Sequence, residues 1–235
     1  MKIPKIHLRS VIFVLAVIVL VVLGIIWKFG FLQPAPVENK GGEAVTFIDR
    51  GFQGDAKAVL EQKIADQENK LATDAEFAKD LSHWLILGNM KYQLGDLSGA
   101  KEIFETKILK DHPDDAPALE NLAQTLYEMG DYEGAELRWR AAISVSPWEV
   151  TYLKLVDLID AKFPARQKEI QGILEEAIAN LGQSAGLVRR LGDWYTDNQQ
   201  YDRALSHYQV AKQLAPDDTS IDERIAEVRK LMSGE

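Results

Sequence analysis

The sequence predicts an all-α protein, in which one transmembrane helix precedes a solenoid of helical hairpins. Two observations predict the solenoid. From about Gly54 onward apolar residues recur at helical spacing, and no stretch shows the sustained alternation of a β-strand. Groups of small and large apolar residues also return at a fixed interval along the chain. The third observation, an uncharged apolar run from Val11 to Trp27, predicts the membrane helix.

The apolar run is long enough to cross a bilayer. At about 1.5 Å per residue its helix spans roughly 25 Å, and Phe29 and Phe31 add length if Lys28 reaches the headgroups. The alternative is a cleavable signal peptide, whose apolar region has about 7 to 15 residues and ends at a small-residue cleavage site. The following stretch KFGFLQPAPV offers no such site, so we expect an uncleaved anchor at residues 11–31.

Flanking charge predicts the orientation of this anchor. Lys2, Lys5 and Arg9 precede the run, whereas Lys28 alone follows it closely. Because short cytoplasmic flanks carry the excess of Lys and Arg, residues 1–10 should be cytoplasmic. We therefore expect a single-pass protein of the cytoplasmic (inner) membrane, with its helical domain periplasmic or extracellular.

Composition narrows the classes of function. The chain has no cysteine, which excludes disulfides, thiol catalysis and cysteine-ligated metal sites. All 36 acidic residues and 23 of the 27 Lys and Arg lie after the expected anchor at residues 11–31, so this part is about 13 charges negative. Such an excess argues against nucleic acid or anionic lipid as the main partner.

A linker and two helices are expected ahead of the repeats. Residues 32–45 contain two Pro and two Gly and predict a flexible linker. Residues 46–80 form an N-terminal helical segment, with helices expected at 54–71 and 74–94. Thr73 and Glu76 have the spacing of a capping box for the second helix. The first helix is either independent or the remnant of a half repeat.

The repeat itself is defined by small and aromatic residues. Gly95-Asp96, Ala100 and Phe104 return 35 residues later as Gly130-Asp131, Ala135 and Trp139, and Ala204 and Tyr208 stand a further 69 residues on. One repeat must lie between the last two copies, and there Phe163-Pro164 replaces the usual turn and is expected to open the second helix. We expect a solenoid of about four repeats at residues 81–218, the third degenerate, and a capping helix at 219–235.

The pattern W-x2-L-G-x2-Y, A-x3-F and Pro at this period resembles the tetratricopeptide repeat (TPR). Tyr92 and Pro113 each stand one place later than the family spacing. The matching residues are Trp84, Leu87, Gly88, Ala100, Phe104 and Pro113 in the first copy; Leu119, Leu122, Ala123, Leu126, Ala135, Trp139, Ala142 and Pro147 in the second; and Leu191, Gly192, Tyr195, Ala204, Tyr208, Ala211 and Pro216 in the last.

The resemblance implies a groove lined by the first helix of each repeat, in which a peptide or a partner helix lies. TPRs that clamp a C-terminal carboxylate use Lys and Asn in this groove, and a clamp is not expected here because the matching pairs differ. The alternative for each groove position is a solvated helix face. The groove residues that the resemblance implies are Leu85, Asn89, Tyr92, Glu120, Gln124, Tyr127, Arg189, Asp193 and Thr196.

No residues form a recognisable catalytic or cofactor site. The sequence lacks a phosphate-binding glycine loop and a nucleophile elbow, and its four histidines lack the spacing of a metal site. Aromatics such as Trp84, Trp139, Trp194, Tyr201 and Tyr208 are expected to pack in the core. We therefore expect no enzyme, no cofactor and no metal.

These expectations favour an interaction protein. The leading hypothesis is a membrane-anchored TPR scaffold or client-holding subunit of an envelope assembly, similar in layout to subunits associated with secretion or with cytochrome c maturation. The alternative is a structural protein that self-associates into an oligomer or filament at the membrane. A regulatory subunit of an enzyme complex ranks third. Layout alone does not identify the protein partner.

Overall fold

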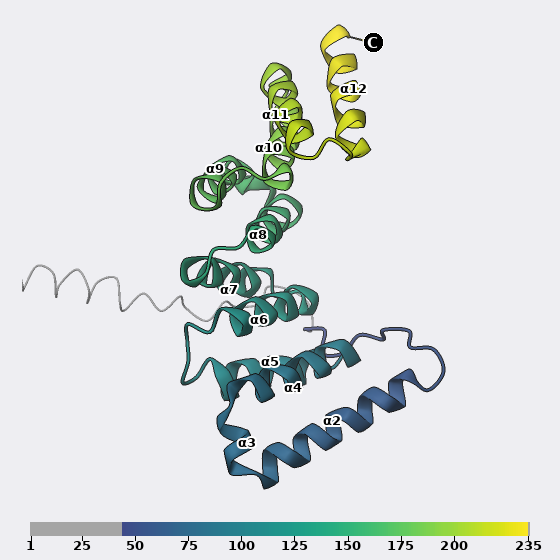
Figure 1. Cartoon of the computed structure of the whole chain (residues 1–235), viewed down its shortest axis with the longest axis vertical. Coiled ribbons are helices and arrows are strands. Elements are labelled where there is room, and N and C mark those ends of the chain that lie inside the picture. Colours follow the sequence, from purple (N-terminus) through teal and green to yellow (C-terminus); the bar gives the residue numbers. More distant parts are fainter. Residues whose placement is uncertain (1–43, 235) are drawn as a thin grey trace, which may run out of the picture. The chain divides into compact units, whose positions relative to one another are not determined.

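The structure is a computed structural model that describes residues 44–234 (Figure 1). Within this range it is all-α, as predicted, and its strand-like pairing is limited to an isolated bridge between Phe47 and Asp96. The elements are α2 (Ala56–Thr73), α3 (Ala75–Lys79), α4 (Leu81–Leu94), α5 (Leu97–Ile103), the π-helical turn η1 (Phe104–Ile108), α6 (Ala116–Met129), α7 (Tyr132–Val145), α8 (Glu149–Lys162), the 3-10 turn η2 (Pro164–Arg166), α9 (Glu169–Leu181), α10 (Ala185–Asp197), α11 (Tyr201–Leu214) and α12 (Thr219–Ser233).

None of the helices between residues 44 and 234 is both long and apolar enough to cross a membrane. The expected anchor at residues 11–31 and nearly all of the linker at 32–45 lie outside the described residues.

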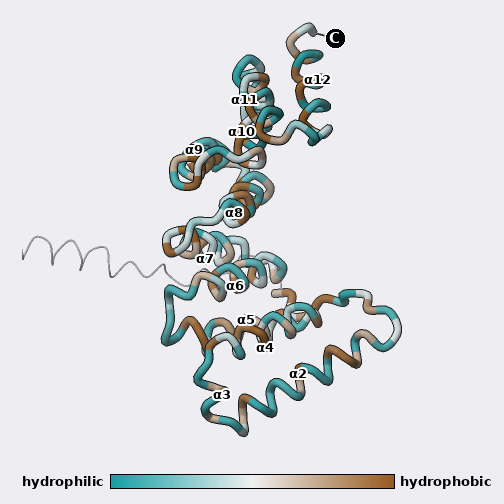
Figure 2. Tube along the Cα trace, viewed as in Figure 1, coloured by the Kyte–Doolittle hydropathy of each residue, from teal (hydrophilic) through white to brown (hydrophobic). Residues whose placement is uncertain are grey.

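The helices pair as hairpins that stack in chain order. The pairs are α4 with α5, α6 with α7, α8 with α9, and α10 with α11, and each pair contacts the next. α12 packs against α11 at one end and α2 packs against α4 at the other. Figure 2 shows hydrophobic and hydrophilic stretches alternating along the helices, which is the pattern expected when each helix buries one side.

A continuous core runs through the stack. It extends from Leu97 to Val228 and contains the small and aromatic residues of every repeat copy. A smaller cluster, in which Ile64 and Leu71 of α2 pack with Leu87 and Ile103, joins α2 to the first repeat. Each hairpin therefore buries its apolar side against its neighbours, as in other repeat solenoids.

The Gly-Asp pair makes the hairpin turn in the first two repeats. Gly95 and Gly130 end their helices in the left-handed conformation, with φ of 95° and 85°. The next residue, Asp96 or Asp131, caps the following helix by accepting a hydrogen bond from the backbone N–H three residues on, at 2.8 and 2.9 Å.

A π-helical turn explains why Pro113 stands one place late. In the first repeat the N–H of Leu109 donates to the carbonyl of Phe104, five residues back, at 2.9 Å. Such a turn accommodates one extra residue within a helix. The second helix of this repeat is therefore one residue longer between Ala100 and Pro113 than its counterpart between Ala135 and Pro147.

The expected helix at 74–94 and its capping box are wrong. The helix is interrupted at Asp80, which separates α3 from α4. The Asp80 carboxylate accepts a hydrogen bond from the N–H of Ser82 at 2.9 Å and so caps the start of α4. Thr73 is the last residue of α2, and its hydroxyl donates to the Asn69 carbonyl at 2.7 Å instead of capping a helix. Asp74 caps α3 in its place, because its carboxylate accepts from two backbone N–H groups.

The start of the second helix in the degenerate repeat also differs from expectation. Pro164 opens only the short turn η2, and α9 begins at Glu169. Arg166 in this turn explains the delay, since its guanidinium forms two hydrogen bonds to Glu136 of α7, at 2.7 and 2.6 Å.

Candidate functional site: the inner face of the first helices

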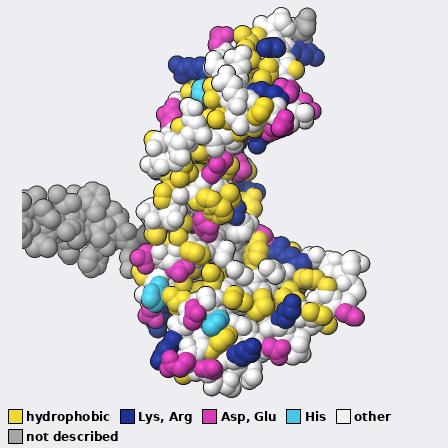
Figure 3. Space-filling model, viewed as in Figure 1, with side chains coloured by type: hydrophobic (Ala, Val, Ile, Leu, Met, Phe, Trp, Pro, Cys, Tyr) yellow, Lys and Arg dark blue, Asp and Glu magenta, His cyan; other side chains and the backbone are white. Residues whose placement is uncertain are grey.

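The first helices of the four repeats, α4, α6, α8 and α10, present one connected polar face, here called the inner face. Asn121 of α6 donates to Asn89 of α4 at 2.8 Å, and Thr151 of α8 donates to Glu120 of α6. Arg190 of α10 pairs with Asp160 of α8 at 2.6 Å. Figure 1 places α7 and α9 on the other side of this row, and Figure 3 shows the surface hollowed between the α12 and α2 ends.

At the N-terminal end, the inner face is occupied by the chain itself. The Arg50 guanidinium lies 4.8 Å from the centre of the Tyr92 ring and 2.7 Å from the Glu128 carboxylate. Tyr92 in turn donates its hydroxyl to Glu128. Burial and the neighbouring Glu128 carboxylate raise the pKa of Tyr92 to about 12, so this phenol stays protonated at neutral pH.

Arg50 is held there by the extended residues 44–50, here called the N-terminal strap. The N–H of Val45 donates to the Met129 carbonyl at 3.2 Å, and the N–H of Ile48 donates to the Gly95 carbonyl at 2.9 Å. Gly95 has no room for a side chain because a Cβ would overlap the Ile48 carbonyl oxygen. The sequence gives no signal for this strap, since main-chain contacts leave no residue pattern.

In the middle of the inner face, Gln124 and Tyr127 of α6 line a cavity of about 180 Å³. Its other walls are Trp139 of α7 and three residues of α8. Glu120 lines a neighbouring hollow of about 310 Å³ beside Trp148, whose side chain is 54% exposed. Leu85 is half-buried against the main core, so it contributes mainly to packing. The three α8 residues that line the cavity beside Gln124 and Tyr127 are Lys154, Asp157 and Leu158.

At the C-terminal end, Arg189, Asp193 and Thr196 line a polar hollow of about 400 Å³. Asp193 accepts a hydrogen bond from the Tyr208 hydroxyl at 2.8 Å. Burial and the nearby Asp160 carboxylate raise the pKa of Asp197. Five carboxylates and three guanidinium groups line this hollow, so its excess charge is negative and disfavours a carboxylate ligand. The remaining lining residues are Asp157, Asp160, Arg190, Asp197, Tyr208, Arg224 and Glu227.

The structure thus brings the predicted groove residues to one face but in three separate groups. The structure adds Lys154, Asp157 and Leu158 of α8, which the sequence analysis did not identify. The degenerate third repeat lacks the Gly that would have allowed its residues to be aligned with those of the other repeats. These α8 residues are identified only from the hollows that α8 lines together with α6 and with α10.

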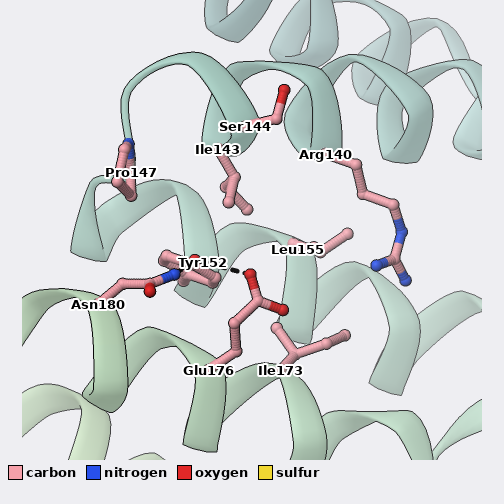
Figure 4. Close-up of a pocket in the computed structure, with 9 residues that line it drawn as sticks. All are labelled: Arg140, Ile143, Ser144, Pro147, Tyr152, Leu155, Ile173, Glu176 and Asn180. Carbon is pink, nitrogen blue, oxygen red and sulfur yellow. Dashed lines mark hydrogen bonds between the residues drawn. The ribbon is translucent and has the colours of Figure 1, made fainter. Parts of the chain in front are cut away.

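A further pocket, of about 400 Å³, lies between α7, α8 and α9 on the side of the second helices (Figure 4). Tyr152 stands at its centre, where its hydroxyl donates to Glu176 at 3.0 Å and accepts from Asn180 at 2.9 Å. Ile143 and Ile173 supply apolar walls. Both hydrogen-bonding functions of Tyr152 are satisfied within the chain.

Among residues 44–234, no group of three or more His, Asp or Glu side chains is placed to hold a metal ion. The charged pairs on the inner face have the character of structural contacts, because Arg190 joins α10 to α8 and Arg50 joins the N-terminal strap to α6. What the arrangement offers chemically is hydrogen bonding and aromatic contact along a row of helices.

Comparison with known proteins supports the repeat. The model of the tetratricopeptide repeat matches residues 91–141. Two crystal structures of MamA protein are similar, with TM-scores of 0.54 and 0.55 at 21% and 17% identity. The matches cover 64% and 75% of this chain, and 81% and 99% of the MamA chains.

YrrB, described as a TPR protein with an unusual peptide-binding site, has a TM-score of 0.54 at 14% identity. That match covers 71% of this chain and 84% of YrrB. No curated protein sequence matches significantly. Residues 91–141 are therefore similar in sequence to the tetratricopeptide repeat, and the described part of the chain shares the fold of solved TPR solenoids.

Proposed function

We propose that this chain is a membrane-anchored TPR-type scaffold that holds a segment of a protein partner on its inner face, outside the cytoplasm. The observation that carries the proposal is the connected row of α4, α6, α8 and α10, which presents polar and aromatic side chains beside open hollows. A row of this kind fits a chain that runs across several helices better than it fits a small molecule.

The bound segment is extended or helical and is held by amide hydrogen bonds and aromatic contacts. We assign this role to Asn89, Gln124 and Tyr127, and the negative C-terminal hollow opposes a terminal carboxylate. YrrB is described as having a peptide-binding site, which supports peptide binding by this architecture.

The proposal assigns no catalysis to the chain. It places the protein in an envelope assembly as a scaffold or client-holding subunit, with the predicted helix at residues 11–31 as its anchor. Protease added to spheroplasts should digest the repeats while a cytoplasmic control protein survives. Protection of the repeats equal to that of the control would contradict the proposed orientation.

Site-specific photo-crosslinking in intact cells tests partner binding. A photoreactive residue would replace Asn89, Gln124 or Asp193 on the inner face, or in matched controls the exposed Glu102, Leu137 or Asp202 of the second helices. We expect one partner to be captured repeatedly from the inner positions and not from the outer ones. Equal capture from both sets would refute an inner-face site.

The same experiment addresses self-association. If the captured partner is a second copy of this chain, the structural alternative replaces the scaffold proposal. Sedimentation of the purified protein over a dilution series then gives the oligomeric state, and a monomer at high micromolar concentration removes that alternative.

A further inference from the structure

Glu120 of α6 is a half-buried carboxylate without a compensating cation in the described part of the chain. Its Oε1 accepts a hydrogen bond from the Thr151 hydroxyl of α8. Its Oε2 has no hydrogen-bond donor among residues 44–234, yet this oxygen is not enclosed by protein. No basic side chain of these residues lies within 4 Å of the carboxylate, Lys154 of the facing helix included. A partly buried carboxylate is more stable beside a cation, so Oε2 is suited to an external one.

Glu128, about two turns further along α6, shows what such a carboxylate binds. Its Oε1 accepts from the Tyr92 hydroxyl, as Oε1 of Glu120 accepts from Thr151. Its Oε2 receives the Arg50 guanidinium at 2.7 Å. Arg50 also donates to the Tyr92 carbonyl at 3.2 Å and lies 4.8 Å from the centre of the Tyr92 ring. A carboxylate, a carbonyl oxygen and an aromatic ring thus bind one arginine of the N-terminal strap.

The hollow of about 310 Å³ beside Glu120 offers the same three kinds of group. Glu120, Asn121 and Trp148 all line it. The amide nitrogen of Asn121 donates to Asn89 at 2.8 Å, which leaves its carbonyl oxygen without a donor among the described residues. Trp148 is 54% exposed, so its ring is accessible to a group that enters the hollow. The volume is at the small end for ligand pockets and suits a single side chain.

Charge around the hollow also favours a cation. α6 begins beside it at Ala116 and Pro117, and a helix N-terminus usually attracts anions. Here the Asp115 carboxylate already accepts from the N–H of Ala118 at 2.9 Å, and Pro117 has no N–H to offer. The chain after residue 31 carries an excess of about 13 negative charges, which attracts a basic segment from a distance.

We propose that this hollow binds an arginine side chain of the protein segment held on the inner face, an inference that rests on the proposed function. The guanidinium donates to Oε2 of Glu120 and to the side-chain carbonyl of Asn121, and it lies against the Trp148 ring. This repeats the contacts of Arg50 with its own carboxylate, carbonyl and ring. A guanidinium has five donors and a flat face that stacks on aromatic rings, whereas a lysine ammonium is a compact point charge.

Nα-acetyl-argininamide is a suitable probe because it carries the side chain without a charged amino or carboxyl terminus. In ¹H–¹⁵N spectra of the full-length protein, we expect it to shift the Trp148 indole signal saturably. Trp139 and Trp194 are 2% and 7% exposed, so their indole signals should stay in place. Trp148→Phe removes the shifted signal and so assigns it.

Two analogues of the probe test the chemistry of recognition. Nα-acetyl-citrullinamide has nearly the same shape and no charge, and we expect it to bind about tenfold more weakly. Nα-acetyl-lysinamide should also bind more weakly than the arginine compound, because it stacks less well on the ring. Equal binding of the citrulline compound, no saturable shift at Trp148, or equal shifts at the buried indoles would each overturn the inference.

A substitution at Glu120 tests the position of the site. Glu120→Gln removes the charge but keeps an oxygen that accepts from Thr151, so it should weaken the probe about tenfold and leave α6 joined to α8. Unchanged indole signals of Trp139 and Trp194 show that the variant is folded. Glu102→Gln, at an exposed position of α5, is the control and should leave the affinity unchanged. Equal affinity in Glu120→Gln and the unchanged protein would overturn the inference.

The inference and the proposed function can fail separately. If crosslinking from Gln124 captures a partner but the probe leaves the Trp148 signal unmoved, the arginine assignment is wrong and the scaffold stands. If the probe binds but the inner face captures no partner, the arginine site is supported and the scaffold is refuted.

Discussion

Gly88 and Gly192 allow the two helices of a repeat to approach closely. A Cβ at Gly88 would lie 2.5 Å from the Phe104 ring, and one at Gly192 would lie 2.7 Å from the Tyr208 ring. Both rings are buried and packed, so they have little space to move. The absence of a side chain at these positions is therefore a packing requirement.

Replacing either glycine with alanine should destabilise the protein. We expect Gly88→Ala and Gly192→Ala each to cost about 1–3 kcal/mol, because the added methyl overpacks the core. Gly172 is the matched control, because it lies within α9 and nothing lies within 4 Å of its Cβ position. Gly172→Ala should stabilise by about 0.5–1 kcal/mol through helix propensity. Denaturant unfolding measures all three, and a loss at Gly172 equal to that at Gly88 would contradict the packing argument.

Among the elements, the π-helical turn has the character of a one-residue insertion. Thr106 and Lys107 are exposed within it, whereas Phe104 and Ile108 are buried. Removing one exposed residue should convert the turn to regular α-helix and restore the spacing from Ala100 to the proline that the second repeat shows.

We therefore expect deletion of Thr106 to change the free energy of unfolding by less than about 1 kcal/mol. Deletion of Ser206, an exposed residue in the regular helix α11, is the control. It should rotate the rest of α11, displace Tyr208 or Ala211 from the core and cost several kcal/mol, about 2–5 by analogy with large core deletions. Thermal unfolding of the two variants measures their losses of stability. Equal losses would show that the π-helical turn is required for the stability of the first repeat.

An ion-pair network joins the degenerate third repeat to the second. Glu136 of α7 is buried, yet it receives hydrogen bonds from Arg166 of the η2 turn and Arg140 of its own helix. Burial raises the pKa of Glu136, but the two guanidinium groups together lower it below its ordinary value of 4.5. The charged carboxylate is thus more favourable in the folded state than in the unfolded one.

The network predicts a pH-dependent contribution to stability. Because the folded pKa of Glu136 is depressed, its contribution is complete above pH 4.5 and is lost as the pH falls through the folded value. Glu136→Gln should therefore cost about 1–2 kcal/mol at pH 7 and progressively less as the solution is acidified below pH 4.5. Glu133→Gln, at an exposed site of the same helix, is the control. A loss for Glu136→Gln that does not change with pH would disprove the assignment.

The sequence predicts the hairpins well because close packing restricts particular positions to small residues, and these positions repeat. It fails where a single contact overrides the pattern. The helical spacing continues through Asp80, but the Asp80 carboxylate hydrogen-bonds the backbone there and ends the helix. The inner-face residues Lys154 and Asp157 were missed because Phe163-Pro164 removes the glycine that aligns the other repeats.

Across the whole described chain, the N-terminal strap connects the first two repeats to the residues that precede them. Its main-chain hydrogen bonds reach Gly95, Met129 and Ser98, and Arg50 adds contacts to Tyr92 and Glu128. Glu128 is only 17% exposed, so it depends on Arg50 for charge compensation. The strap therefore fastens the first two repeats to each other at the N-terminal end of the inner face.

Arg50→Ala tests this connection. Loss of the guanidinium leaves Glu128 half-buried and unpaired, so we expect a cost of about 1–2 kcal/mol and faster hydrogen exchange at the amides of Val45, Ile48 and Ser98. Lys57→Ala is the control, since the pair of Lys57 with Glu61 is exposed at 54% and 51% and contributes little. Adding Glu128→Gln should recover part of the loss, because it removes the uncompensated charge. Unchanged exchange in Arg50→Ala would mean that the backbone contacts alone hold the strap.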